Sequence, residues 1–269
     1  MTWTNTAAYG EYILTYTHGD GTVLAGAYRP AIGSAEITPG GIIIPIWNSG
    51  TVEDISSTPS TGVAGNTLVT LTTYDRRRVV HMKPSEWNRF TDDHGYRDII
   101  ARGLGRDLVG DALTKFYGII VDEGSDGGAL GATPAGSVWA SNLLTKMAQI
   151  KAYWVDGVTS KMTIFLTPSG ASALAINQQG AFNYAPSPSP IFGNWMGADI
   201  YVTNNALSGS GTVIGGIFSE MGMAYASALI DMIAIGEKEP LTATRLTTAA
   251  HTFGIKSLDA NQVFYFTKT

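Results

Sequence analysis

Residues 244–256 read TRLTTAAHTFGIK, and the predicted fold of the C-terminal third depends on this stretch and its neighbours. It follows an acidic turn, Glu237-Lys238-Glu239-Pro240, and contains an aromatic-glycine-aliphatic step at Phe253-Gly254-Ile255. Short apolar runs bounded by turn residues are typical of strands. On this basis we predict strands at residues 213–218, 229–235, 241–248 and 263–266.

Before this β-rich region, strands and helices are mixed. Apolar residues three and four positions apart indicate helices, and a proline suits the first position of a helix. We therefore predict strands at 162–166 and 200–202, a short helix from Pro168 to Ile176, a helix from Val138 to Trp154 with Ser137 as its candidate cap, and an exposed rigid loop at 186–190.

A longer helix is predicted between Tyr96 and Tyr117, where apolar spacing indicates one amphipathic helix of about 22 residues. Asp92-Asp93 offers an N-cap at the positive end of its dipole. Internal glycines cost roughly 1 kcal/mol each relative to Ala, so this helix either packs closely or bends. The glycines are Gly103, Gly105 and Gly110. After it we predict a brief strand at 119–121 and a glycine-rich loop at 124–136.

The N-terminal part is predicted to be extended. Residues 1–35 form a polar, tyrosine-containing arm, and strand-like runs follow at 42–47, 67–72 and 78–82. The polar segment 49–66 between the first two runs indicates the tip of an extended β-hairpin. This order lacks the strict alternation of a doubly wound sheet, so the predicted fold class is α+β.

The composition is unusually low in charged residues. Hydrophobic residues make up 44% of the 269 residues, which is enough for a core, but charged residues make up only 14%, against ~25% in a typical domain. No charge occurs from Ile55 to Tyr74, and Asp199 is the only charge from Met162 to Ser219. We interpret these neutral stretches as surface that copies of the chain or other partners cover.

Other classes of protein are excluded or disfavoured. The chain has no Cys, so thiolate sites are absent, and it has no apolar run of about 18 residues that would predict a membrane span. A net charge of −5 argues against a sequence-specific nucleic-acid reader. Arg76, Arg77 and Arg78 form a local basic triplet, which predicts either a salt-bridged face or contact with phosphates.

Two segments contain residues typical of a metal site or a phosphate-binding loop, but a structural role explains each of them better. Asp92, Asp93 and His94 have the residue types of metal ligands, but a helix cap explains them better. The segment from Gly124 to Gly131 resembles a phosphate-binding loop, but it lacks an acidic ribose partner further along, and a flexible loop is favoured. We therefore predict no catalytic residue, no metal site and no cofactor.

The C-terminal third resembles a known family. The strands from Ile214, the acidic turn, the stretch 244–256 and the last strand resemble the end of tailed-phage major capsid proteins, which have the Hong Kong 97-type shell fold. Residues 165–174 and 198–204 look like the strand-helix segment and the next strand of that family's axial domain. The resemblance implies an N-terminal arm (1–35), an extension loop (36–83), a first part of the peripheral domain (84–157) with a spine helix at 96–117, an axial domain (158–227) and returning peripheral strands (228–269).

The resemblance implies a structural protein and not an enzyme. Such a subunit self-assembles into the pentamers and hexamers of an icosahedral phage head around double-stranded DNA, and the shell is assembled in the host cytoplasm. Its implied partners are copies of itself, a portal, a scaffold protein and a cement or decoration protein, with no membrane. DNA contact would be non-specific, at an inner face, with Arg76, Arg77 and Arg78 the first candidates.

Two departures from the family affect these expectations. The shell-like region begins almost at Met1, so we expect a separate scaffold protein or assembly without one. Residues 1–82 contain no Lys, which argues against the Lys–Asn bond that some relatives form near the extension loop. The alternatives are an encapsulin-type nanocompartment shell and, less favoured, a nucleotide-binding enzyme that uses the segment Gly124–Gly131.

Overall fold

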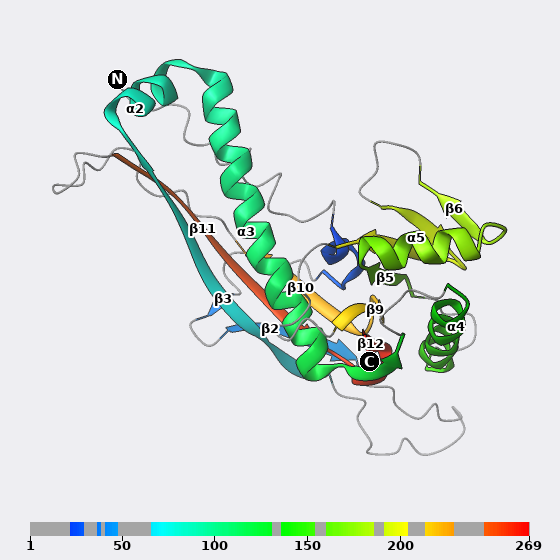
Figure 1. The fold of residues 1–269 in the computed structure, drawn as a ribbon. Coiled ribbons are helices and arrows are strands. Elements are labelled where there is room, and N and C mark those ends of the chain that lie inside the picture. Colours follow the sequence, from blue (N-terminus) through cyan, green and yellow to red (C-terminus); the bar gives the residue numbers. More distant parts are fainter. Residues whose placement is uncertain are drawn as a thin grey trace, which may run out of the picture.

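The computed structural model describes residues 22–29, 37–38, 41–47, 66–130, 136–153, 160–185, 191–203, 213–228 and 245–268. These parts form two β-sheets, a long helix beside the first sheet and two shorter helices on the second (Figure 1). The α+β class predicted from the sequence is confirmed. The predicted strand at 229–235, the loop at 186–190 and most of the arm at 1–35 lie outside the described residues.

The first sheet contains a long two-stranded ribbon. Its strand order is β1-β2-β3-β11-β10, and all neighbouring strands are antiparallel. The ribbon consists of β3 and β11, paired from Thr72 with Ile255 to Met82 with Arg245, and it extends away from the second sheet (Figure 1). The strand bounds are β1 (Ile37–Thr38), β2 (Gly41–Trp47), β3 (Asn66–Met82), β10 (Met223–Ala228) and β11 (Arg245–Ser257).

The strand β3 joins two runs that the sequence separates. The predicted strands at 67–72 and 78–82 are one strand, because residues 73–77 pair with β11. The other predicted run, 42–47, lies in β2 and pairs with the beginning of β3. This antiparallel pair agrees with the predicted hairpin, whose tip at 48–65 lies outside the described residues.

Two consecutive helices connect the end of the ribbon to the second sheet. Helix α2 covers Pro84–Asp92, and α3 covers His94–Glu123, which is 30 residues and exceeds the 22 predicted for 96–117. The prediction of a strand at 119–121 is wrong. Ile119 and Ile120 continue the buried face of α3, and a three-residue apolar run is compatible with either a strand or a buried helix.

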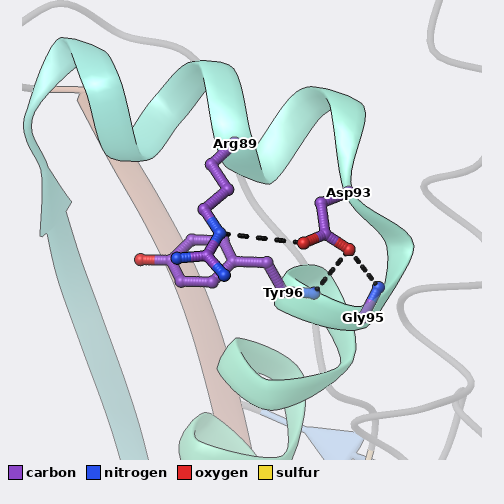
Figure 2. Close-up of polar contacts among 4 residues, drawn as sticks. All are labelled: Arg89, Asp93, Gly95 and Tyr96. Atoms are coloured by element: carbon purple, nitrogen blue, oxygen red, sulfur yellow. Dashed lines mark hydrogen bonds and ion pairs between the residues drawn. The ribbon is translucent and has the colours of Figure 1, made fainter.

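The predicted cap of the long helix is confirmed. Asp93 Oδ1 accepts hydrogen bonds from the amides of Gly95 and Tyr96, at 2.8 and 3.3 Å (Figure 2). Arg89 at the end of α2 forms a 3.7 Å ion pair with Asp93, and its guanidinium lies 5.0 Å from the centre of the Tyr96 ring. These contacts cap α3 and link its first turn to the end of α2.

The second sheet has helices on both faces. Its strand order is β4-β12-β9-β5-β8-β7-β6, with β4 and β8 parallel to their neighbours β12 and β5. On one face lie α4 (Gly136–Ala152) and α5 (Pro168–Asn177); on the other lie the end of α3 and the short helix η1 (Val23–Gly26). The strands are β4 (Ser125–Ala129), β5 (Met162–Leu166), β6 (Phe182–Tyr184), β7 (Gly193–Trp195), β8 (Ala198–Val202), β9 (Val213–Ser219) and β12 (Val263–Thr267).

Alternating side chains of the second sheet divide the core. Ile164 and Leu166 of β5 pack toward α4 and α5, whereas Phe165 packs toward Phe116 and Tyr117 of α3. A third cluster joins the ribbon to α2 and the first half of α3. It contains Met82, Trp87, Phe90, Ala101, Leu104, Leu108 and Ala249.

The structure confirms one of the helix starts predicted around α4 and α5 and corrects the other. The helix from Pro168 is confirmed, and the side chain of Thr167 caps it. Ser137 lies inside α4 and not before it, so the predicted cap is wrong. The predicted loop at 124–136 is also wrong over 125–129, which form β4 at the edge of the second sheet.

Candidate assembly surfaces

The basic triplet does not form one site. Residues of β3 alternate between the face that meets α3 and the opposite face. Arg76 forms a 2.9 Å ion pair with Asp111 of α3, and Arg78 donates a 2.9 Å hydrogen bond to Asp107. Arg77 is exposed, and within the described residues it has no ion-pair partner. The salt-bridged interpretation therefore holds for two of the three arginines.

Tyr74 also helps to hold the ribbon against α3. Its ring lies 5.4 Å from that of Phe253, and the ammonium of Lys115 in α3 lies 5.6 Å from its centre. Surface ion pairs alone contribute little, about 0–1 kcal/mol each, so the apolar contacts supply most of the attachment. The ribbon and α3 lie side by side and form one extended unit (Figure 1).

Three glycines of α3 have open surroundings within the subunit. A Cβ atom added at Gly103, Gly110 or Gly118 would have no atom within 4 Å, so these glycines do not serve close packing within the subunit. On the same helix Ile99 is 65% exposed. Two explanations for Gly103 and Gly110 follow from the sequence, close packing of the helix or bending of the helix. Their open surroundings exclude close packing within the subunit, so bending remains.

A pair of glycine substitutions tests this point. Gly103→Ala and Gly110→Ala are each expected to raise the free energy of unfolding by up to about 1 kcal/mol, because helix propensity improves and nothing opposes the added methyl. Chemical denaturation of the unassembled subunit measures the effect. Gly127→Ala is the control with the opposite sign, because its Cβ would lie 2.6 Å from the Phe266 ring. A loss of stability in the α3 variants would contradict the open environment.

Among the described residues, the end of the second sheet near β6 carries no charge and exposes large apolar side chains beside neutral polar ones. Three large side chains are exposed there: Ile176 at 63%, Tyr184 at 62% and Met196 at 47%. Phe182 pairs with Trp195, which brings the Met196 turn next to the connection between α5 and β6. We call Ile176, Tyr184 and Met196 the axial end. It lies far from the tip of the ribbon (Figure 1).

The single charge of this region is neutralised. Asp199 forms a 2.9 Å ion pair with Lys161 and accepts a 3.2 Å hydrogen bond from the side-chain amide of Asn194. Met196 has a left-handed backbone, with φ of 52°, and the next residue, Gly197, has φ of 86°. This turn presents a methionine to solvent at the cost of an unfavourable conformation for a non-glycine residue.

The glycine-rich segment is not arranged to bind phosphate. In β4, Ser125 and Asp126 pair with Phe264 and Tyr265 of β12. Gly127 lies against the Phe266 ring, and the amide of Gly128 donates to the carboxylate of Asp126 at 2.8 Å. Gly127 therefore permits close packing at the edge of the sheet. The amide of Gly128, which a bound anion would need, already donates to the Asp126 carboxylate.

One of the candidate metal ligands has a structural role. Asp93 is engaged as the cap of α3. Within the described ranges no group of three His, Asp or Glu side chains is arranged to hold a metal ion. Across the same ranges, no helix combines the length and the apolar character needed to span a bilayer.

One buried tyrosine connects α3 to the second sheet. The Tyr117 ring lies 5.2 Å from that of Phe165, and burial raises the pKa of Tyr117 to about 12, an effect that a hydrogen bond with Thr203 partly opposes. Between pH 10 and 12 the unfolded chain would lose this proton while the folded subunit keeps it. The stability of the subunit is therefore expected to fall as pH rises above about 10, by about 2–3 kcal/mol at pH 12 for this group.

Tyr117→Phe isolates that contribution. The substitution is expected to flatten the alkaline slope of the unfolding free energy, measured by urea titration from pH 9 to 12. The pKa values of Lys161 and Tyr201 are also raised, so part of the slope should remain. An unchanged slope in the Phe variant would show that Tyr117 ionises equally in both states.

The sequence did not identify the exposed side chains as candidate surface residues. Ile99 lies in the helix predicted at 96–117, whose apolar residues were expected to face the core. Tyr184 lies in β6, a short strand that was not predicted, and Met196 lies in the turn between β7 and β8. The signal that was available is the absence of charge from Met162 to Ser219. That stretch contains all three residues of the axial end.

Comparison with known proteins supports the fold over nearly the whole chain. No family model and no curated protein sequence matches it. Among solved structures, it is similar to one from Mycobacterium phage Che8, with a TM-score of 0.61 and 15% identity over 92% of this chain and 91% of the other. The chain has the Hong Kong 97-type shell fold. Two further shell structures give similar values.

The first of these is a virus-like particle from Pyrococcus furiosus, with a TM-score of 0.60 and 11% identity over 97% of this chain and 98% of the other. The second is the capsid of cyanophage P-SCSP1u, with a TM-score of 0.59 and 10% identity over 90% and 86%. Since the shell fold matches from end to end while identity is 10–15%, side-chain roles must be argued from this chain itself.

Proposed function

We propose that this chain is the major capsid subunit of a tailed phage. The observation that carries the proposal is the end-to-end match to phage shell structures, with TM-scores of 0.61 and 0.59. The subunit assembles into pentamers and hexamers, which close into an icosahedral head around double-stranded DNA. It is assembled in the host cytoplasm and remains in the virion, and its role is structural and not enzymatic.

The axial end supports assembly around a rotation axis. At such an axis identical side chains from each copy meet, so any charge faces its own like charge. An exposed apolar end without a free charge avoids this repulsion and has area to bury at about 25 cal/mol per Å2. We therefore assign Ile176, Tyr184 and Met196 to the contact between copies at the centre of a capsomer.

DNA contact is proposed to be weak and independent of sequence. Of Arg76, Arg77 and Arg78, Arg77 is the first candidate because the other two pair with α3. A net charge of −5 per subunit opposes tight binding. A scaffold protein, a cement or decoration protein and a portal are the further partners that the proposal implies.

A second function rests on a specific observation. The similarity to the virus-like particle from Pyrococcus furiosus is as close as that to the phage shells, and it keeps the encapsulin-type alternative open. Particles purified from native lysate and treated with nuclease distinguish the two. Protected double-stranded DNA supports the phage head, whereas particles that contain protein cargo and no DNA support the nanocompartment.

A further inference from the structure

A pocket of about 490 Å3 lies between α4 and the last strand. Its volume is within the range of sites that bind small molecules or a few residues of a peptide. The described residues that line it are Lys146, Gln149 and Ala152 of α4, Tyr153 just after that helix, Asn261 of the short helix η3 (Ala260–Gln262), and Phe264 of β12.

The lining combines an aromatic surface with an unmatched positive charge. The ammonium of Lys146 lies 4.8 Å from the centre of the Phe264 ring, and within the described residues it has no carboxylate partner. Helix α4 carries Lys146 and Lys151 but no Asp or Glu, in a chain whose net charge is −5. The pocket therefore suits a segment that brings both an aromatic ring and a carboxylate.

We propose that this pocket binds the stretch Tyr9-Gly10-Glu11-Tyr12 of a second copy of the chain. Residues 1–21 contain Glu11 and Asp20 and no Lys or Arg, and their aromatic residues are Trp3, Tyr9, Tyr12 and Tyr16. In the complex, the Glu11 carboxylate pairs with Lys146 and a neighbouring tyrosine packs beside Phe264. Residues 48–65 are also acidic, but they contain no aromatic residue, which makes them the weaker match.

The position of Val23 and Leu24 indicates that the bound segment comes from a second copy of the chain and not from the same subunit. Val23 and Leu24 are buried with α3 on one face of the second sheet, whereas Lys146 and Gln149 belong to the helix on the other face. To reach α4, the subunit's own arm would have to pass around an edge of the second sheet, whereas the arm of a neighbouring subunit need not start from that face. This inference rests on the proposed function, because only an assembled shell supplies that neighbour.

Cysteine cross-linking tests the contact, because the natural chain contains no Cys. Tyr12→Cys and Gln149→Cys are made as separate single variants with tags of different mass, then co-assembled and oxidised. The inference predicts disulfide-linked dimers that contain one copy of each variant. Ile55→Cys, from the hairpin tip, replaces Tyr12→Cys in the control. Closed shells without mixed dimers, or dimers formed with Ile55→Cys and not with Tyr12→Cys, would overturn it.

The double variant Tyr12→Cys/Gln149→Cys excludes the alternative of the subunit's own arm. A bond within one chain, visible as a faster-moving monomer without a ladder of oligomers, would contradict a second copy. A ladder that is lost on reduction supports it. Since the wild-type chain is assembled in parallel, failure of the proposed function appears separately as a wild type that forms no shells.

A charge exchange tests the chemistry of the pocket. Lys146→Glu is expected to raise the subunit concentration needed for assembly by about tenfold, and Lys146→Glu with Glu11→Lys is expected to restore it. Lys151→Glu makes the same charge change on α4 outside the pocket lining and should have a smaller effect. Rescue by Glu53→Lys instead of Glu11→Lys, or equal effects of both lysine variants, would overturn the proposal.

Discussion

Replacing Leu108 with Asp is expected to leave almost no folded subunit. Leu108 is 3% exposed and packs in the cluster that joins the ribbon, α2 and α3. Losing a buried leucine costs about 2–5 kcal/mol, and burying an unpaired carboxylate adds several more. The sum is comparable with the entire stability of a typical domain, which is about 5–15 kcal/mol. The yield of soluble protein and its thermal unfolding measure the loss.

Ile99→Asp is the matched control for this prediction. It introduces the same carboxylate on the same helix, but Ile99 is 65% exposed, so the subunit should fold normally. Soluble, stable and normally assembling Leu108→Asp protein would show that the buried face of α3 is assigned wrongly. A folded Ile99→Asp subunit that assembles poorly would identify the outer face of α3 as a contact between subunits.

Replacing Met196 with Asp is expected to prevent capsomer formation without unfolding the subunit. Asp tolerates a left-handed backbone better than Met does, so the φ of 52° at this position favours the substitution locally. In a ring of copies, however, each carboxylate faces the same carboxylate of its neighbours. At about 4 Å this repulsion is about 1–4 kcal/mol per pair, and it is repeated around the ring.

Met196→Asn separates the charge from the change of shape. Asn also tolerates the left-handed conformation but stays neutral, so its capsomers should form in far higher yield than those of Met196→Asp. Size-exclusion chromatography with light scattering measures the oligomers, and thermal unfolding checks that both variants are folded. Equal assembly of the two variants would contradict a contact between copies at the axial end.

The sequence predicted correctly those helices and strands that are specified by a few neighbouring residues. Asp93 before the apolar repeat of α3 and Thr167-Pro168 before α5 identify helix starts correctly, since capping depends on adjacent residues. The buried runs 162–166 and 263–266 are strands, as predicted. The length and order of these elements also supported the resemblance to shell proteins, and the fold agrees with it.

The errors occur where tertiary contacts decide. The segment Ser125–Ala129 has the composition of a loop, but pairing with β12 and packing of Gly127 on Phe266 make it a strand. The run 119–121 is helical because the second sheet offers α3 a surface to cover. Arg76 and Arg78 looked equivalent to Arg77, and only the register with β11 and the position of α3 distinguish them.

The surfaces that we propose for assembly were hardest to predict, because the sequence signals that we used depend on contacts within one chain. Ile99 and Met196 look like ordinary core residues in the sequence, and their exposure becomes evident only in the folded subunit. From the neutral stretch between Met162 and Ser219 we predicted a surface that copies of the chain or other partners cover, and this remains a prediction. The stretch does not indicate which side chains point outward, since that depends on strand pairing at β6 and β7.

Negative-stain electron microscopy of the protein expressed alone shows whether the subunit assembles into a shell. We expect capsomer rings or closed shells tens of nanometres across, and few free subunits in the same material. Adding a candidate scaffold protein would then change the yield or size of the shells. A 28.5 kDa monomer that stays monomeric at high concentration and with scaffold added would contradict self-assembly into a shell.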